Sequence, residues 1–398
     1  MTGPCKAVHI AGDVYWVGAI DWNVRDFHGY STNRGTTYNA YLVLGERPAL
    51  IDTVKAPFAE EMLERIASVI APADIKAVIS NHSEMDHSGG LPMAIGAIRP
   101  EKIYASVMGA QALRAHFHED WKIEAVADGA VLPVGSSSMT FLESRMLHWP
   151  DSMIGFLEAE KILFSNDIFG MHLASSGRFI DEVPDWRYEA AKYYANIILP
   201  YSGVVTAFLK KFAASGLKPA LIAPDHGPVW RGNTREIVEL YGAFAAQKRA
   251  DRAVVVYDTM WNSTEKLARA VAEGLLDGGT PVRVMPLKSH HRSDIAVELL
   301  DAGALLAGTP TLNKGIYPVM ADFMTYIKGL EPQGLTGNVF GSYGWAPHGT
   351  AQLRGYFEDM GIEFAGEAAE CRYVPDHAAL MKAFELGRAV SARLKTAV

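Results

Sequence analysis

Cysteine is nearly absent from this sequence. Only Cys5 and Cys371 occur among the 398 residues, and there is no CxxC pair. So few thiolates cannot build a disulfide scaffold, and they cannot hold an iron–sulfur cluster or a rubredoxin-type iron. Any redox centre must therefore use other ligands, for which the 13 histidines are candidates.

An excess of positive charge and long apolar runs are missing as well. Lys and Arg number 37 against 45 Asp and Glu, a net charge of −8, which disfavours nucleic acid or an anionic membrane as partner. No apolar run reaches the roughly 18 residues of a membrane span, and the first residues carry no signal-peptide-like apolar stretch. With 49% hydrophobic and 21% charged residues, we expect a globular, cytoplasmic protein with no nucleic-acid and no membrane partner.

The length suggests two or three domains, and the pattern changes near residue 250. Before this point, short strands and loops alternate with a few predicted helices. Charged residues then gather at 247–252, directly before a strand-like run at 253–257. The rest alternates, with strands predicted at 253–257, 282–286 and 303–307 and helices at 264–276 and 295–300, which predicts a doubly wound parallel sheet. We expect domains at 1–250 and 251–398.

Four potential metal ligands crowd into six residues after the strand-like run 76–80: His82, Glu84, Asp86 and His87. A polar loop in which Asp86 caps the next helix would explain one such residue. It explains the density of all four less well, and imidazole and carboxylate are common metal ligands in proteins. The segment therefore predicts a metal site.

Three further candidates are His148, Asp167 and His226. Asp167 and His226 follow the strand-like runs 161–164 and 220–223, and His148 also comes just after a strand-like run. Loops at strand ends on a rigid scaffold hold multi-ligand sites in fixed geometry. We expect one end of a sheet to collect all these side chains.

The order His-x-Glu-x-Asp-His, followed by a distant His, Asp and His, resembles the ligand pattern of flavodiiron proteins. The resemblance implies a metallo-β-lactamase-like αββα sandwich, in which Glu84 stands where related hydrolases carry a second His. It also implies two irons, with Asp167 between them. One iron would bind His82, Glu84 and His148, and the other Asp86, His87 and His226.

Glu84 also bears on the identity of the metal. Zinc hydrolase sites favour imidazole, whereas an added carboxylate hardens the site and offsets the charge of two irons. Iron is the better expectation. A dinuclear zinc hydrolase with a flavodoxin-like passenger domain stays as the alternative.

The second domain begins with a hydroxyl-rich turn at 258–265, which suits a phosphate at a helix N-terminus, although a plain Ser/Thr helix cap explains it as well. Two later loops, 308–315 and 341–349, resemble the isoalloxazine-binding loops of flavodoxins, so FMN is implied. The sequence has no dinucleotide fingerprint here. The predicted FMN residues are Thr259, Met260, Trp261, Asn262, Ser263, Thr264, Pro310, Thr311, Leu312, Asn313, Gly315, Ser342, Tyr343, Gly344, Trp345 and Ala346.

Three more residues are candidates for the substrate pocket. The family places a histidine from the segment 21–30 near the open face of the di-iron site, which suggests His28. His172 and Tyr194 are predicted to line the pocket as proton or hydrogen-bond donors, against ordinary packing.

The resemblance covers nearly the whole chain and implies an oxidoreductase that reduces O₂ to water, NO to N₂O, or both. Because no CxxC segment is present, we expect a separate rubredoxin or similar small electron carrier as donor. The family also implies a head-to-tail homodimer or a dimer of dimers. A bare electron carrier, which would reduce its flavin without consuming O₂ or NO, is a further alternative.

Overall fold

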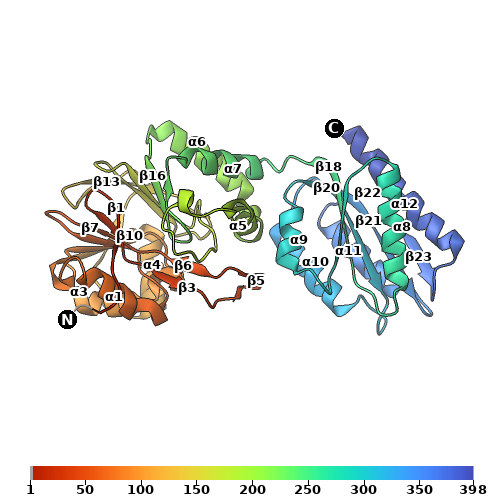
Figure 1. Cartoon of the computed structure of the whole chain (residues 1–398), viewed down its shortest axis with the longest axis horizontal. Helices are drawn as coiled ribbons and strands as arrows, with labels where there is room; N and C mark the ends of the chain where they lie inside the picture. Colours follow the sequence, from red (N-terminus) through yellow and green to blue (C-terminus); the bar gives the residue numbers. More distant parts are fainter. Residues whose placement is uncertain (1–2, 398) are drawn as a thin grey trace. The chain divides into compact units, whose positions relative to one another are not determined.

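The computed structural model describes residues 3–397 (Figure 1). The chain forms two compact units. The first comprises the residues up to His28, Thr32–Tyr194 and Gly203–Gly242, and the second comprises Gly29–Ser31, Ala195–Ser202 and the residues from Ala243 onward. The boundary expected between residues 250 and 251 lies at the start of β18 (Ala250–Tyr257), and the division at that point stays a prediction.

The first unit contains a seven-stranded sheet among the described residues, whose β8, β9, β10 and β11 run parallel. In spatial order its strands are β1 (Val8–Ala11), β2 (Val14–Trp16), β7 (Tyr41–Val43), β8 (Ala49–Ile51), β9 (Ala77–Ser80), β10 (Lys102–Ser106) and β11 (Ile123–Val126). Its helices are α1 (Ala59–Ala67), α2 (Met85–Ser88), α3 (Leu91–Ile98) and α4 (Val107–Phe117). Short strands precede β7 along the chain: β3 (Ala19–Asp21), β4 (Asp26–Phe27), β5 (Tyr30–Ser31), which is assigned to the second unit, and β6 (Thr36–Tyr38).

A six-stranded sheet forms the second layer of this unit, with β15 and β16 parallel and its other neighbours antiparallel. Its strands are β12 (Val131–Val134), β13 (Ser137–Glu143), β14 (Met153–Leu157), β15 (Ile162–Asn166), β16 (Leu221–Pro224) and β17 (Trp230–Arg231). Figure 1 shows the green helices α6 and α7 beside it. The helices are α5 (Trp186–Tyr193), α6 (Ser202–Ser215) and α7 (Thr234–Ala245).

Alternation along the strands builds two cores in this unit. Leu42 and Val78 pack with residues of α1, α3 and α4, whereas Tyr41 and Ile79, one position away, pack with residues of the six-stranded sheet. Successive strand residues point to opposite faces, so a strand buried on both sides is apolar throughout. The result is a sandwich of two sheets whose strand ends are held rigidly, which is what a multi-ligand site needs.

The second unit is a parallel sheet in the order β19-β18-β20-β21-β22, with β23 also pairing with β21. α8 and α12 pack with β18 residues on one face, and Figure 1 shows α9 and α10 on the opposite side. Helices on both faces make this the expected doubly wound sheet. Its further elements are α8 (Ser263–Asp277), β19 (Val282–Pro286), α9 (Arg292–Glu298), β20 (Ala302–Pro310), α10 (Pro318–Leu330), β21 (Thr336–Tyr343), α11 (His348–Asp359), β22 (Glu363–Phe364), β23 (Ala369–Arg372) and α12 (His377–Ala397).

The element predictions in this unit are mostly confirmed. The helix expected at 264–276 is α8, and the strand expected at 282–286 is β19. The helix expected at 295–300 is wrong in its limits, because α9 starts at Arg292 and ends at Glu298. The side chain of His291 accepts a hydrogen bond from the Ser293 amide, which starts the helix earlier.

The helical stretch Trp186–Ser215 is long and apolar enough, by length and composition, to cross a membrane. It combines α5, a π-helical segment at Tyr194–Ile198 and α6, and Pro200 lies within it. Core helices of soluble proteins meet the same criterion, and Tyr193, Tyr194 and Ile198 are fully buried here. The stretch therefore does not by itself indicate a membrane span.

Candidate metal centre and cofactor cavity

The cluster 82–87 lies directly behind β9, as expected. β9 ends at Ser80, the loop that follows carries His82 and Glu84, and the one-turn helix α2 carries Asp86 and His87. Glu84 is 9% exposed and the other three are more deeply buried. Buried polar side chains at this density require partners, which the rest of the chain brings to them.

Those partners come from the six-stranded sheet. His148 stands in the loop after β13, Asp167 follows β15 directly, and His226 lies two residues beyond β16. The structure thus brings all seven predicted metal residues together, in two groups: His82, Glu84, His148 and Asp167 form one, and Asp86, His87 and His226 the other.

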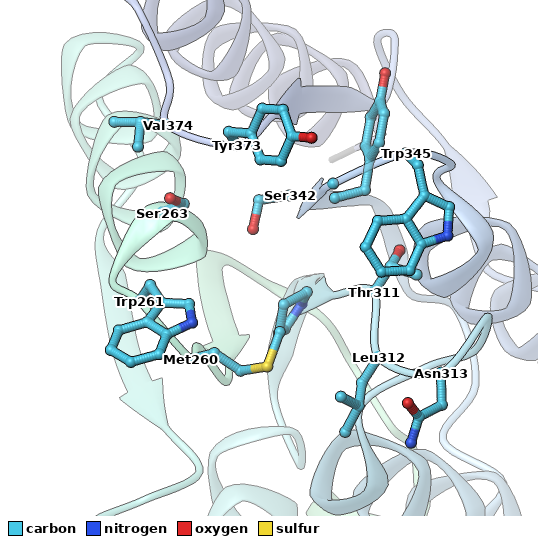
Figure 2. A pocket seen from close by; sticks show the side chains of 13 residues that line it. Met260, Trp261, Ser263, Thr311, Leu312, Asn313, Ser342, Trp345, Tyr373 and Val374 are labelled. Carbon is cyan, nitrogen blue, oxygen red and sulfur yellow. The ribbon is translucent and has the colours of Figure 1, made fainter.

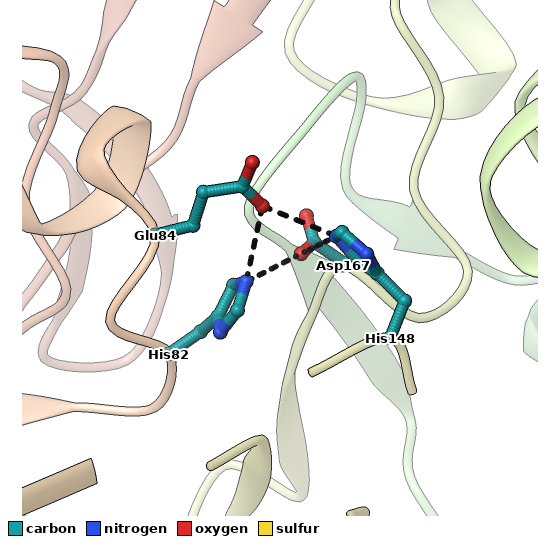
Figure 3. A group of neighbouring side chains, drawn as sticks. All are labelled: His82, Glu84, His148 and Asp167. Carbon is teal, nitrogen blue, oxygen red and sulfur yellow. Dashed lines mark hydrogen bonds and ion pairs between the residues drawn. The ribbon is translucent and has the colours of Figure 1, made fainter. Parts of the chain in front are cut away.

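Figure 3 shows the first group around a common centre. The His82 Nε2 atom lies 3.3 Å from Glu84 Oε2 and 3.4 Å from Asp167 Oδ2. The His148 Nε2 atom lies 3.2 Å from the same glutamate oxygen and 3.3 Å from the same aspartate oxygen. Four donor atoms thus face one point, as metal coordination requires.

The second group repeats this arrangement. The Nε2 atoms of His87 and His226 lie 3.4 and 3.1 Å from the two oxygens of Asp86. The same two nitrogens lie 3.2 and 3.5 Å from Asp167 Oδ1. Asp167 therefore turns one oxygen to each group, as a residue bridging two metal ions would.

Buried polar atoms without hydrogen-bond partners also indicate a pair of metal ions. Within residues 3–397, both carboxylate oxygens of Asp86 and of Asp167 are buried without a hydrogen-bond partner, and so are both ring nitrogens of His87. Orphaned buried polar atoms are rare in native proteins, and metal coordination satisfies them. Three carboxylates with four imidazoles suit redox-active iron better than zinc.

Electrostatics keep the carboxylates ionised. Burial alone would raise the pKa of Asp167, but the charge of His87 and the contacts with His148 and His82 together outweigh burial and hold that pKa well below its usual range. Burial alone would lower the pKa of His82, but contacts with Asp151 and Glu84 raise it to about 10. The carboxylates are therefore ionised, which is the form that binds a metal ion.

Buried carboxylates behind the ligands are residues that the sequence analysis did not single out. Asp151 contacts His82, Asp225 contacts His87, and Asp52 accepts hydrogen bonds of 2.7 Å from the Asn81 amide and side chain. A sequence signal exists for two of them, because Asp225 precedes His226 and Asp151 closely follows His148. A lone Asp beside a ligand is also a common cap or turn residue, so the signal is ambiguous.

His28 lies at the edge of the cluster. Its Nε2 atom is 2.9 Å from Glu84 Oε1, while 65% of its side chain is exposed. The hydrogen bond with Glu84 raises the pKa of His28. His28 therefore links solvent to a residue of the first group.

His172 is fully buried against His226, with ring centroids 4.5 Å apart, and its Nδ1 atom is 2.8 Å from the Thr36 hydroxyl. Burial and the nearby His226 hold the pKa of His172 well below its usual value. The side chain is therefore a neutral imidazole near the second group.

Tyr194, predicted to line the substrate pocket, is fully buried. Its ring packs edge-to-face on Tyr241, 5.0 Å away. The neighbouring Tyr193, not singled out, packs on His172 at 5.1 Å, and burial and the charge of Asp167 raise its pKa well above the usual value. Consecutive helical residues point in different directions, so the two tyrosines have different neighbours.

The second unit has a cavity of about 490 Å³ at the carboxyl ends of its parallel strands, within the range of about 300–1,000 Å³ typical of cofactor sites. Figure 2 shows Trp261 and Trp345 on opposite sides of it. These side chains are 87% and 76% exposed, unusual for tryptophan, and offer flat faces to a planar ring. The predicted FMN residues that line it are Met260, Trp261, Ser263, Pro310, Thr311, Leu312, Asn313, Ser342, Tyr343, Gly344 and Trp345.

The turn before α8 suits a phosphate. In the described chain no side chain caps the N-terminus of α8, and Asn262 holds the left-handed conformation there with φ of 63°. The Thr259 hydroxyl is buried without a hydrogen-bond partner among residues 3–397. Uncapped helix amides and a free hydroxyl form an anion site, so the donor set fits the phosphate of FMN.

Three residues near this site were not predicted. Tyr373 and Val374, which follow β23, line the cavity. The Lys288 ammonium donates to the Thr259 carbonyl at 2.8 Å. The other predicted residues, Asn262, Thr264, Gly315 and Ala346, belong to the same loops, and the Thr264 and Ser342 hydroxyls lie 3.0 Å apart.

Comparison with known families matches both units. The ODP family beta lactamase description fits residues 36–227, and the Flavodoxin description fits residues 255–387. The predicted fold class, a metallo-β-lactamase-like αββα sandwich followed by a flavodoxin-like parallel sheet, is confirmed.

Relatives that match this chain over nearly its full length have the same family character. The chain is 43% identical to the Rubredoxin-oxygen oxidoreductase of Megalodesulfovibrio gigas, with 98% of each chain covered. It is 40% identical to the Nitric oxide reductase of Moorella thermoacetica, with 98% of this chain and 99% of the relative covered. The solved flavodiiron protein from Giardia intestinalis is 29% identical and superposes with a TM-score of 0.91, covering 99% of this chain and 98% of that one.

Proposed function

This chain belongs to the flavodiiron protein family, and from that premise we propose that it reduces O₂ to water, NO to N₂O, or both, with electrons from an external rubredoxin-type donor. It is an oxidoreductase, and its cofactors are FMN and a non-haem di-iron centre. Two ferrous ions and reduced FMN together supply four electrons, as many as one O₂ needs to form two waters.

The observation that carries the proposal is the pair of donor groups that share Asp167. Each group offers two imidazole nitrogens, a carboxylate of its own and one oxygen of Asp167. Glu84 gives the first group a carboxylate where a zinc hydrolase site favours imidazole. We therefore assign His82, Glu84, Asp86, His87, His148, Asp167 and His226 as the iron ligands.

The family membership argues against the two alternatives. A dinuclear zinc hydrolase with a flavodoxin-like passenger is disfavoured by full-length relatives named as oxygen and nitric oxide reductases. A bare electron carrier needs only its flavin, so it would not account for the buried cluster of metal-ligand side chains.

Three side chains are proposed to serve the substrate pocket. His28 bonds a Glu84 oxygen and reaches solvent, so it is suited to bring protons to the first group. His172, as a neutral imidazole, and the Tyr193 hydroxyl are suited to donate hydrogen bonds near the second group. The role first predicted for Tyr194 is thus proposed for Tyr193 instead.

The remaining proposals concern the FMN loops, the partners and the location. The loops that carry the predicted FMN residues are proposed to hold the phosphate at α8 and the ring between Trp261 and Trp345. A rubredoxin donor is supported by the name of the Megalodesulfovibrio gigas relative. The head-to-tail homodimer, or dimer of dimers, and the cytoplasmic location remain proposals that follow from the family.

The test is consumption of O₂ and, anaerobically, of NO by the purified chain with its cofactors and a reduced rubredoxin. We expect donor oxidation that depends on at least one of the two gases. The Asp86→Asn variant, which alters only the proposed metal centre, should keep its FMN and lose most of the activity. Absence of gas consumption by protein that contains iron and FMN would refute the proposal.

A further inference from the structure

The two donor groups are chemically matched. Each has two imidazole Nε2 atoms, one carboxylate of its own, Glu84 or Asp86, and one oxygen of the shared Asp167. The ligands alone therefore give little reason for one group to bind a metal ion more tightly than the other. A difference must come from the residues behind the ligands, which orient an imidazole and set its basicity.

Behind His82 of the first group stands a fixed carboxylate. The two oxygens of Asp151 lie 3.3 and 3.4 Å from His82 Nδ1. One of these oxygens also accepts the Ser83 amide at 2.6 Å, and the Asp151 carbonyl accepts the Ser106 hydroxyl at 2.6 Å. The side chain of Asp151 is only 2% exposed. It fixes a proton on Nδ1 and so orients the ring with Nε2 toward the metal position.

The second group has no carboxylate hydrogen-bonded behind its imidazoles among residues 3–397. His226 Nδ1 donates to the Thr37 carbonyl at 2.7 Å, a neutral acceptor. His87 Nδ1 lies 3.7 Å from Asp225 Oδ2 and makes no hydrogen bond within the described chain. Neither imidazole is therefore hydrogen-bonded to a carboxylate behind it.

One contact lowers the expected metal affinity of the first group. His28 bonds the Glu84 Oε1 atom at 2.9 Å, which draws electron density from a ligand of the first group. However, 65% of the His28 side chain is exposed, so solvent screens its effect. Asp151 acts inside the protein, where electrostatic effects are stronger. The effect of Asp151 therefore exceeds that of His28, and we expect the first group to bind a metal ion more tightly.

We propose that Asp151 is a positioning residue that makes the group around His82 the tighter metal site. The first metal ion then binds at His82, Glu84, His148 and Asp167, and the second enters the Asp86 group afterwards. The inference rests on the proposed function, because it requires both groups to hold metal. Loss of such an outer carboxylate typically costs about 10–100-fold in metal affinity.

Two variants that each leave one group complete provide the test. His226→Ala preserves the first group, and His148→Ala preserves the second. The full-length chains, stripped of metal, are titrated with Co²⁺, whose visible spectrum changes when the ion leaves water and is coordinated by the protein. We expect His226→Ala to bind one Co²⁺ about 10–100-fold more tightly than His148→Ala, and the wild-type titration to show two phases.

Asp151→Asn is then added to each variant. Asparagine retains an acceptor for the Ser83 amide but removes the charge. We expect it to weaken Co²⁺ binding about 10–100-fold in the His226→Ala chain and to leave the His148→Ala chain nearly unchanged. Asp225→Asn is the matched control and should not affect the His226→Ala chain.

Each other outcome overturns the inference in a distinct way. Equal affinities of the two single-group variants would refute the difference between the sites. Equal weakening of both by Asp151→Asn, with a lower unfolding midpoint, would give Asp151 a general structural role instead. If neither variant nor the wild type binds Co²⁺, the proposed metal centre itself fails.

Discussion

Replacing Asp167 with asparagine should release both metal ions, not one. Asp167 Oδ2 faces the Nε2 atoms of His82 and His148, and Oδ1 faces those of His87 and His226, at 3.2 to 3.5 Å. A single negative charge about 4 Å from a divalent ion contributes about 8 kcal/mol at an effective dielectric constant of about 20. If relaxation of the site and entry of water restore three quarters of this interaction energy, a loss of about 2 kcal/mol remains. Such a loss raises the dissociation constant of each metal ion about thirty-fold.

The amide also presents an N–H donor to one of the two groups, where a metal ion needs an acceptor. The assay is iron per chain after expression with iron and dialysis against a weak chelator. Asp86→Asn is the matched comparison, because Asp86 belongs to one group and its loss should release one iron. The bridging argument is refuted if Asp167→Asn retains as much iron as Asp86→Asn, or as much as the wild type.

Three further changes address other parts of the protein. Glu84→His should shift metal retention from iron toward zinc, since it restores the imidazole-rich set of a hydrolase, and unchanged iron content would count against the carboxylate argument. Thr259→Val should weaken FMN binding by about 10–100-fold, the value of a hydrogen bond to a charged group, while leaving riboflavin binding unchanged; equal weakening of both would contradict a phosphate contact. Tyr193→Phe should lower the rate of gas consumption at unchanged iron content, whereas Tyr194→Phe should not, and the reverse result would return the role to Tyr194.

The seven candidate ligands come together as the sequence predicted, in part because ligand density is a local signal. His82 to His87 lie on one loop and one turn of helix, so spacing alone gathers them. The convergence of Asp167 and His226 followed from their positions after strands, since strand ends meet at one edge of a sheet. The pairing of ligands into two groups came from the family resemblance and not from spacing.

Other features depend on tertiary packing and could not be predicted in this way. The choice between Tyr193 and Tyr194 depends on how the helix is rotated about its axis, which the sequence did not specify. Asp151 became informative only when folding placed it 3.3 Å from His82. Tyr373 and Val374 line the FMN cavity from beyond β23, a strand that the sequence pattern did not indicate.

The central claim is that two matched donor groups each hold an iron ion. Anomalous diffraction from crystals of the iron-grown protein, recorded on both sides of the iron and zinc absorption edges, tests it most directly. The account predicts two iron peaks per chain, one within each donor group and with Asp167 between them. Zinc peaks at these positions, or a single iron peak per chain, would contradict it.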